Sequence, residues 1–246
     1  MSDAMIPSAG GFRPTVSPVY AEQIRRWHER AYEEGKAEGA ETQYFDYLGI
    51  SIEVPPDVMP ITPMSHLLGE AIRSEARVGE LVLDMGTGSG VNAVLAAKNG
   101  ARVAAVDINP KALGAARANA DRNAVRDLVD VRYSDVFSEV DESFDLIIFD
   151  PPFRWFAPRS LFETAMTDEH YGAMTRFFRE SRDHLLPSGR MLIFFGTSGD
   201  LGYLRQLIAQ ERFVATTVAG DALDRDGWTV EYLTLLLRRE EETARA

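Results

Sequence analysis

The strongest constraint on the fold is an alternation of short apolar runs with longer helical stretches that begins near residue 80. The apolar runs are 80–85, 102–107, 128–133, 144–150 and 190–195. Helical patterning lies near 90–99, 110–123, 168–185 and 200–210. Neighbouring parallel strands need a crossover connection, which is usually a helix. The alternation therefore predicts an α/β fold, with a doubly wound parallel sheet and helices on both of its faces.

Two further apolar segments follow the last helical stretch with only a short turn-rich connection between them. They are RFVATTVAG at 212–220 and WTVEYLTLLL at 228–237. This spacing is too short for a crossover and predicts a terminal antiparallel hairpin.

The segment before residue 78 reads differently and is expected to cover the sheet domain. Tyr20, Ile24, Trp27 and Ala31 fall on one face of a helix that should dock through that face. Residues 1–15 read as a mobile tail, 47–55 as a short strand and 64–76 as a helix. We expect an N-terminal tail, helix and lead-in cover at 1–77, a ligand-binding domain at 78–240 and a tail at 241–246.

Composition excludes several kinds of chemistry. The chain has no cysteine, and its four histidines lack metal-binding spacing, so neither disulfides nor a metal site is predicted. The net charge of −12 disfavours a nucleic-acid partner without excluding one. The chain shows neither a signal-like start nor an apolar run long enough to span a bilayer, so a cytoplasmic protein without membrane partners is expected.

A glycine-rich turn joins the first apolar run to an alanine-rich helix. Its sequence runs from Asp84 through Gly86, Thr87 and Gly88 to Gly90. Such glycines let the backbone turn tightly and approach a ligand, and the next helix presents free N–H groups. A nucleotide-like ligand is predicted, although a turn required only by packing would give the same pattern.

Acids also stand at the ends of the next two apolar runs. Asp107 is placed to accept hydrogen bonds from ribose hydroxyls, and Asp135 to meet an exocyclic adenine amine. The alternative for Asp107 is that it caps the helix beginning at Asn109 and Pro110.

The fourth run ends in Asp150, Pro151, Pro152 and Phe153. The prolines fix the backbone and remove two N–H donors, leaving an array of acceptors. An NH₂ group can donate to the Asp150 carboxylate and the Pro151 carbonyl while Phe153 stacks on the planar group that bears it. A simple strand-terminating turn is the alternative.

The segments LVLDMGTGSG, AVDINP, YSDVF and FDLIIFDPPF resemble class I S-adenosylmethionine-dependent methyltransferases, over roughly residues 55 to 240. The resemblance implies a Rossmann-like seven-stranded sheet and S-adenosyl-L-methionine as cofactor. The DPPF motif and residues 171–196 most resemble release-factor glutamine methyltransferases and their small-methyltransferase-domain relatives. The resemblance implies these cofactor-binding residues: Asp84, Gly86, Thr87, Gly88, Gly90, Asp107, Ile108, Asp135, Val136 and Asp150.

The motif also indicates the acceptor. An ionised Asp150 only accepts hydrogen bonds, which favours an amino, guanidino or amide nitrogen of a small molecule or protein side chain. The alternatives are an exocyclic amine of an RNA or DNA base, or a non-catalytic module that binds S-adenosylmethionine. The predicted catalytic residues are Asp150, Pro151 and Phe153. Candidate substrate contacts are Arg154, Trp155 and Glu163. The alternatives are that Trp155 is a packing residue and that Glu163 faces water.

Overall fold

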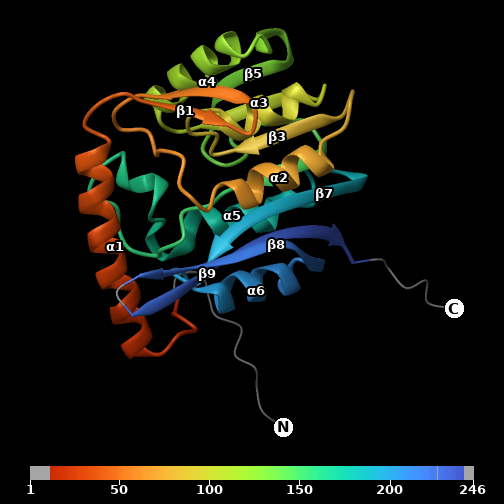
Figure 1. The fold of residues 1–246 in the computed structure, drawn as a ribbon. Coiled ribbons are helices and arrows are strands. Elements are labelled where there is room, and N and C mark those ends of the chain that lie inside the picture. The colour runs from red at the N-terminus through yellow and green to blue at the C-terminus, as the bar shows by residue number, and fades with distance from the viewer. Residues whose placement is uncertain (1–11, 226, 241–246) are drawn as a thin grey trace, which may run out of the picture.

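The computed structural model of the protein describes residues 12–225 and 227–240. Its centre is a seven-stranded sheet with strand order β5-β4-β3-β6-β7-β9-β8 (Figure 1). The strands are β3 (Leu81–Met85), β4 (Arg102–Asp107), β5 (Val129–Tyr133), β6 (Phe144–Phe149), β7 (Leu185–Gly196), β8 (Phe213–Arg225) and β9 (Trp228–Arg239). The first five pair in parallel, whereas β9 runs antiparallel to both β7 and β8. The predicted α/β sheet and its terminal hairpin are confirmed.

Helices cover both faces of the sheet, as the alternation predicts. One group, in mutual contact, contains α2 (His66–Glu75), α3 (Val91–Lys98) and α4 (Pro110–Arg122), and the other contains α5 (Gly172–Ser181) and α6 (Leu201–Gln210) (Figure 1). Short 3₁₀ turns lie at Arg126–Leu128, Glu163–Ala165 and Glu169–Tyr171. The inward side chains of β3, β6 and β7 are fully buried. The core therefore fixes the strand ends, where the conserved geometry of such sheets places ligands.

The order of the strands creates one point at which the chain direction across the sheet reverses. From β3 the chain moves outward through β4 to β5, then returns to place β6 on the other side of β3. Ligands bind to open α/β sheets in the crevice outside the carboxyl ends of the strands at such a point. The ends of β3 and β6, at Asp84 and Asp150, flank it.

One predicted boundary is wrong. The helix expected at 168–185 ends at Ser181, and β7 begins five residues before the predicted run. Leu185 pairs with Phe144 at the start of β6 and is buried there. Burial of this side chain against the sheet outweighs continuation of the helix.

The N-terminal cover consists of α1 (Pro18–Glu38), a hairpin of β1 (Gln43–Tyr47) and β2 (Ile50–Val54), and α2. Ser17 caps α1 by accepting a hydrogen bond from the Tyr20 N–H, and Ile24 and Trp27 are buried as predicted. The strand predicted at 47–55 is confirmed as β2, but it begins later than predicted because the chain turns at Leu48 and Gly49, both with positive φ, and β1 before the turn was not predicted. In Figure 1, α1 lies at the side of the sheet toward which the β3 arrow points.

The predicted mobile tail is also partly wrong. Residues 1–11 lie outside the described residues, as do 241–246, but the next residues are docked. The Phe12 ring packs edge-on against Tyr171 and Tyr203, with centroids 5.2 and 5.0 Å away. The Thr15 N–H donates to the Asp200 carboxylate at 2.6 Å. These partners are more than 150 residues away in the sequence, which hides the docking from local patterns. The division at residue 77 stays a prediction.

Candidate active site

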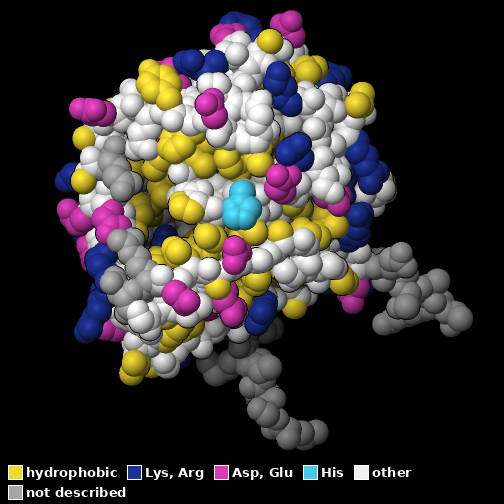
Figure 2. Space-filling model, viewed as in Figure 1, with side chains coloured by type: hydrophobic (Ala, Val, Ile, Leu, Met, Phe, Trp, Pro, Cys, Tyr) yellow, Lys and Arg dark blue, Asp and Glu magenta, His cyan; other side chains and the backbone are white. Residues whose placement is uncertain are grey.

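The four acids singled out in the sequence lie at one edge of the sheet. Asp84 is the penultimate residue of β3 and Asp107 is the last residue of β4. Asp135 follows β5, and Asp150 follows β6. Parallel pairing of these strands brings their carboxyl ends together. Figure 2 shows a hollow on the α1 side of the molecule, with hydrophobic side chains gathered on its wall and acidic side chains near its rim.

Asp84 forms the buried floor of this site. Its side chain is 1% exposed, and Oδ2 accepts hydrogen bonds from Thr87 Oγ1 at 2.6 Å and the Ala93 N–H at 3.1 Å. Oδ1 has no hydrogen-bond partner among the described residues. Burial, reinforced by the negative charge of Asp107, raises the pKa of Asp84 to about 7. A buried carboxylate oxygen without a partner suits a cationic or N–H-bearing ligand.

The three glycines of the turn serve two purposes. All have positive φ, with values of +67° at Gly86, +54° at Gly88 and +81° at Gly90. A Cβ at either of the first two would meet nothing within 4 Å, whereas at Gly90 it would lie 2.7 Å from the Ala116 Cα. Gly86 and Gly88 therefore leave open a backbone cradle, and Gly90 allows α3 to pack on α4. The loop therefore contains both glycines that leave room for a ligand and a glycine that packing requires.

Asp107 ties the glycine loop to the next strand. Its carboxylate accepts from the Gly88 N–H at 2.9 Å and the Asn109 N–H at 2.8 Å. Burial raises its pKa. The helix cap is Asn109, whose side chain accepts from the Lys111 N–H, so the capping alternative for Asp107 is wrong. Its carboxylate is partly exposed next to Ile108, and the ribose contact stays a prediction.

Asp135 and Val136, the residues predicted to contact adenine, already form hydrogen bonds within the protein. Asp135 accepts a hydrogen bond from Arg176 of α5 at 2.7 Å, which occupies one of its oxygens. Val136 is buried with a φ of +55°, and its carbonyl accepts from Ser134 Oγ. A role of Asp135 and Val136 toward adenine stays a prediction that the structure leaves untested.

The Asp150 side chain reaches solvent, although protein atoms surround it closely. Its side chain is exposed at the site, and no described residue donates a hydrogen bond to it. Displacement of bulk water, together with the charge of Asp84, raises its pKa to about 7. Pro151 behind it is buried. Asp150 is therefore an acceptor without a donor, held at the point where the strand order reverses.

The rest of the motif is fixed from behind. The Phe153 carbonyl accepts a hydrogen bond from the Tyr171 hydroxyl at 2.5 Å, and this hydroxyl accepts from the Asp200 N–H at 2.8 Å. A Cβ at Gly199 would lie 2.1 Å from the same carbonyl. Tyr171 is fully buried, and no local pattern in the sequence indicates this hydrogen bond.

Phe153 itself is a packing residue in this structure. Its ring is 9% exposed and lies 5.0 Å from the Phe195 centroid and 6.2 Å from that of Tyr232. Trp155 is likewise buried, against Phe156 and Phe12, so the packing alternative holds for it. Stacking of Phe153 on an acceptor stays a prediction.

The water-facing alternative for Glu163 is wrong, and its substrate role stays a prediction. The side chain is 1% exposed and accepts from His28 Nε2 at 2.8 Å and Arg159 Nη2 at 2.6 Å. These contacts join the loop after the motif to α1. His28 is 135 residues away in the sequence, so no local signal identifies the pair.

The N-terminal hairpin adds a residue that the sequence did not indicate. Burial raises the pKa of Tyr47 in β1, and the charges of Glu70 and then Asp150 raise it further. The hydroxyl therefore lies within electrostatic reach of Asp150.

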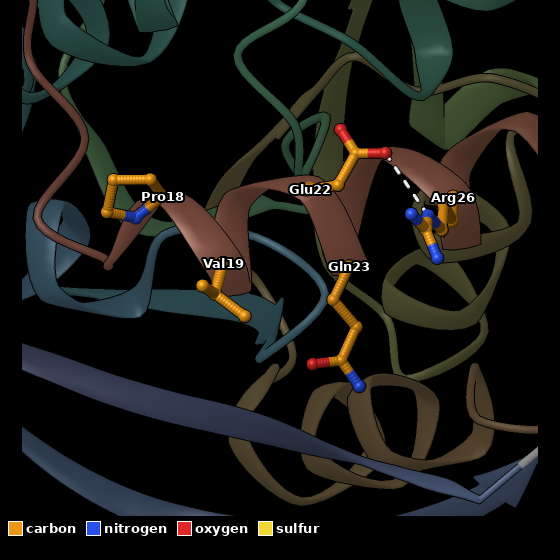
Figure 3. Close-up of a pocket in the computed structure, with 5 residues that line it drawn as sticks. All are labelled: Pro18, Val19, Glu22, Gln23 and Arg26. Carbon is orange, nitrogen blue, oxygen red and sulfur yellow. Dashed lines mark hydrogen bonds and ion pairs between the residues drawn. The ribbon is translucent and has the colours of Figure 1, made fainter.

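Other features of the described residues are negative or remote. Across 12–225 and 227–240, no three His, Asp or Glu side chains are grouped to hold a metal ion. No helix within those ranges is long and apolar enough to cross a membrane. A shallow surface hollow beside the first turns of α1 is lined by Pro18, Val19, Glu22, Gln23 and Arg26 (Figure 3). It contains none of the predicted site residues.

The strand order, the open glycine cradle and the acids at four strand ends define a Rossmann-like methyltransferase of class I. The chain belongs to the methyltransferase small domain family, whose model matches residues 61–219. The sequence resemblance is thereby confirmed, including its link to S-adenosylmethionine-dependent enzymes.

Individual relatives differ in the acceptor that their names state. The chain is 34% identical over 184 residues to ribosomal RNA small subunit methyltransferase C of Chromohalobacter salexigens, covering 72% of this chain and 50% of that protein. It is 39% identical over 120 residues to the release factor glutamine methyltransferase of Rhodopirellula baltica, covering 45% and 40%. It is 46% identical over 85 residues to the ribosomal protein L11 methyltransferase of Thermosipho africanus, covering 34% and 32%. The chain spans half or less of the length of these relatives.

Solved structures share the fold. The 16S rRNA N2 G1207 methyltransferase of T. thermophilus, in complex with AdoMet and guanosine, has a TM-score of 0.58 at 22% identity, covering 81% of this chain and 50% of that one. The ribosomal protein L11 methylase of Lactobacillus delbrueckii subsp. bulgaricus has a TM-score of 0.56 at 22% identity, covering 76% and 84%. Relatives named for RNA and for protein occur together, so the charge argument against a nucleic-acid acceptor is not upheld.

Proposed function

We propose that this protein transfers a methyl group from S-adenosylmethionine to a nitrogen atom. The observation that carries the proposal is Asp150, an acceptor without a donor that stands across the strand-order reversal from the open cradle of Gly86 and Gly88. A module that only holds the cofactor has no need for a free acceptor at this place.

The residues present fit the cofactor. The cradle leaves room for a ligand at the backbone, and the unpaired Oδ1 of Asp84 suits a positively charged or N–H-bearing group. Asp107 would hold the ribose, with Ile108, Asp135 and Val136 around the adenine. When bound, S-adenosylmethionine supplies an electrophilic methyl group on a positively charged sulfur. Asp84, Asp107 and Asp150 together make the surroundings of that charge acidic.

Asp150 then orients the acceptor. Its carboxylate accepts one N–H of the nitrogen, and the Pro151 carbonyl accepts a second, which fixes the direction of the nitrogen lone pair. The raised pKa makes this carboxylate more basic than an ordinary aspartate, so Asp150 can take up the proton that the nitrogen loses. Because Asp150 reaches solvent, the proton can leave from its carboxyl oxygen to water.

For the acceptor we propose an amino, guanidino or amide nitrogen of a small molecule or a protein side chain. The acidic side chains of Asp84 and Asp150 at the site support a neutral or cationic group at that nitrogen. A second candidate is the exocyclic amine of a nucleic-acid base. It is favoured by the ribosomal RNA relative, which matches more of this chain than the protein-directed relatives do.

Methyl transfer with and without Asp150 tests the proposal. Labelled S-adenosylmethionine is offered with basic peptides, fractionated metabolites and RNA, using the wild type, Asp150→Ala and the exposed control Asp141→Ala. We expect Asp150→Ala to lose about 100-fold or more in turnover and to keep its affinity for S-adenosylhomocysteine. Undiminished turnover in Asp150→Ala contradicts the proposed role, and RNA as the preferred acceptor selects the second candidate.

A further inference from the structure

A second buried charge lies beside the DPPF motif and has no counterion among the described residues. Arg154 directly follows the motif and is 8% exposed. Its Nη2 donates to Ser198 Oγ at 3.1 Å, and its guanidinium carbon lies 5.6 Å from the Phe153 ring centroid. Its Nε has no hydrogen-bond partner in the part of the chain that the structure describes. Tyr232 and Tyr171 also lie within electrostatic reach of the guanidinium, but no carboxylate among the described residues does.

Such an arrangement is costly for a protein to keep. Removing an ion from water is unfavourable unless an opposite charge and hydrogen bonds compensate. Arg190 is a buried arginine whose charge is compensated by carboxylates. It is 3% exposed and donates hydrogen bonds to Glu75 at 2.7 Å and to Glu80 at 3.1 Å. For Arg154, burial lowers the pKa, and no carboxylate of the described chain opposes that effect.

Asp150 does not supply the missing charge. The pKa of Asp150 is raised, and its causes are burial and Asp84, with no opposing contribution from Arg154. The Arg154 guanidinium and the Asp150 carboxylate are therefore not paired with each other.

The position of Arg154 is fixed as firmly as the motif. Its N–H donates to the Met166 carbonyl at 3.3 Å, and its carbonyl accepts from the Asp168 N–H at 2.8 Å. Ser198 follows β7, the strand that pairs with β6, so both polar groups stand at the carboxyl edge of the sheet. This is the edge that carries the proposed acceptor site.

We propose that Arg154, together with Ser198, binds an oxyanion of the methyl acceptor, either a carboxylate or a phosphate. The guanidinium offers planar N–H groups suited to two oxygens, and the Ser198 hydroxyl can donate a further hydrogen bond. The acceptor class is then a small molecule that presents a nitrogen to Asp150 and an acidic group to Arg154. This inference rests on the proposed function for the identity of the ligand, but not for the anion site itself.

Anion binding to the intact chain tests the site without requiring turnover. Calorimetric titrations with formate and with inorganic phosphate are made at constant ionic strength in chloride, on protein saturated with S-adenosylhomocysteine. We expect one of these anions to bind to the wild type with 1:1 stoichiometry. Arg154→Met should weaken that binding by about tenfold or more, and the exposed control Arg205→Met on α6 should not. Absence of binding at about 50 mM anion, a concentration well above that expected for a charge-assisted contact, or equal binding to Arg154→Met, overturns the proposal.

Two further measurements separate the explanations of a loss. If Arg154 binds an external anion, Arg154→Met in chloride without formate or phosphate should unfold at the same temperature as the wild type or at a higher one. A lower unfolding temperature indicates a structural role and contradicts the proposal. Affinity for S-adenosylhomocysteine should be unchanged, and a marked loss would assign Arg154 to the carboxylate of the cofactor instead. Anion binding that persists in a protein without methyltransferase activity would sink the proposed function alone.

Discussion

The buried contact between Glu163 and α1 allows a quantitative test. Burial by itself would raise the pKa of Glu163, but hydrogen bonds from Arg159 and then His28 outweigh it and lower the pKa from 4.5 to about 2. A difference of this size corresponds to about 3 kcal/mol. Because the Arg159 side chain is 48% exposed, screening by solvent reduces the value. We therefore expect Glu163→Gln to lower the free energy of unfolding by about 2 kcal/mol at pH 7.

Urea denaturation between pH 7 and pH 3 measures this effect. A lowered folded-state pKa supplies stability that is complete above 4.5 and is lost as the pH falls toward about 2. The difference between the wild type and Glu163→Gln should accordingly narrow below pH 4.5, because acid removes the same charge from the wild type. The exposed control Glu169→Gln should change stability by less than about 0.5 kcal/mol. A Glu163→Gln variant as stable as the wild type at pH 7, or a difference that widens below pH 4.5, would refute the reasoning.

Three further outcomes are expected. Carbon-13 NMR of the Asp150 carboxyl should show a midpoint near pH 7 in the free protein, because displacement of bulk water and then the charge of Asp84 raise its pKa. The midpoint should be lower with S-adenosylmethionine bound, and a midpoint at 3.8 in the free protein contradicts this prediction. Tyr171→Phe should lower kcat about tenfold and leave cofactor affinity within about twofold, as measured by initial rates and calorimetry, because only the hydrogen bond to the motif carbonyl is lost. Gly90→Ala should lower the free energy of unfolding by more than about 2 kcal/mol through overlap with α4, whereas Gly88→Ala should mainly weaken cofactor binding; the reverse order in urea denaturation would contradict the division of roles.

The sheet could be predicted from the sequence because its signals are local. Each apolar run and each helical stretch is read within about ten residues, and the glycine turn lies directly between two of them. The strand β1 was not predicted, because it lacks such a local signal. Its sequence QYFDY contains two polar residues in five and no buried side chain, so it carries no clear apolar signal. Its pairing with β2 and the positive φ of Leu48 become visible only in three dimensions.

The same distinction applies to the site. The acids at the strand ends follow from topology, since parallel strands deliver their carboxyl ends to one edge. Glu163 and Arg154 do not follow from it, because their environments depend on partners 135 and 44 residues away. A charged residue in a loop is ordinarily solvated. Only packing shows that Glu163 has its counterion among the described residues and that Arg154 does not.

The docking of α1 on the terminal hairpin has a consequence for how the protein matures. The Trp27 ring meets Trp228 edge-on at a centroid distance of 5.1 Å, and Tyr20 meets the same ring at 5.7 Å. The first described helix thus closes against the last pair of strands. A ribosome makes the N-terminal helix first, yet this contact waits until the chain has been synthesised past Trp228. Contacts between such distant segments form slowly. We infer that the glycine cradle can assemble on a nascent chain before α1 is docked.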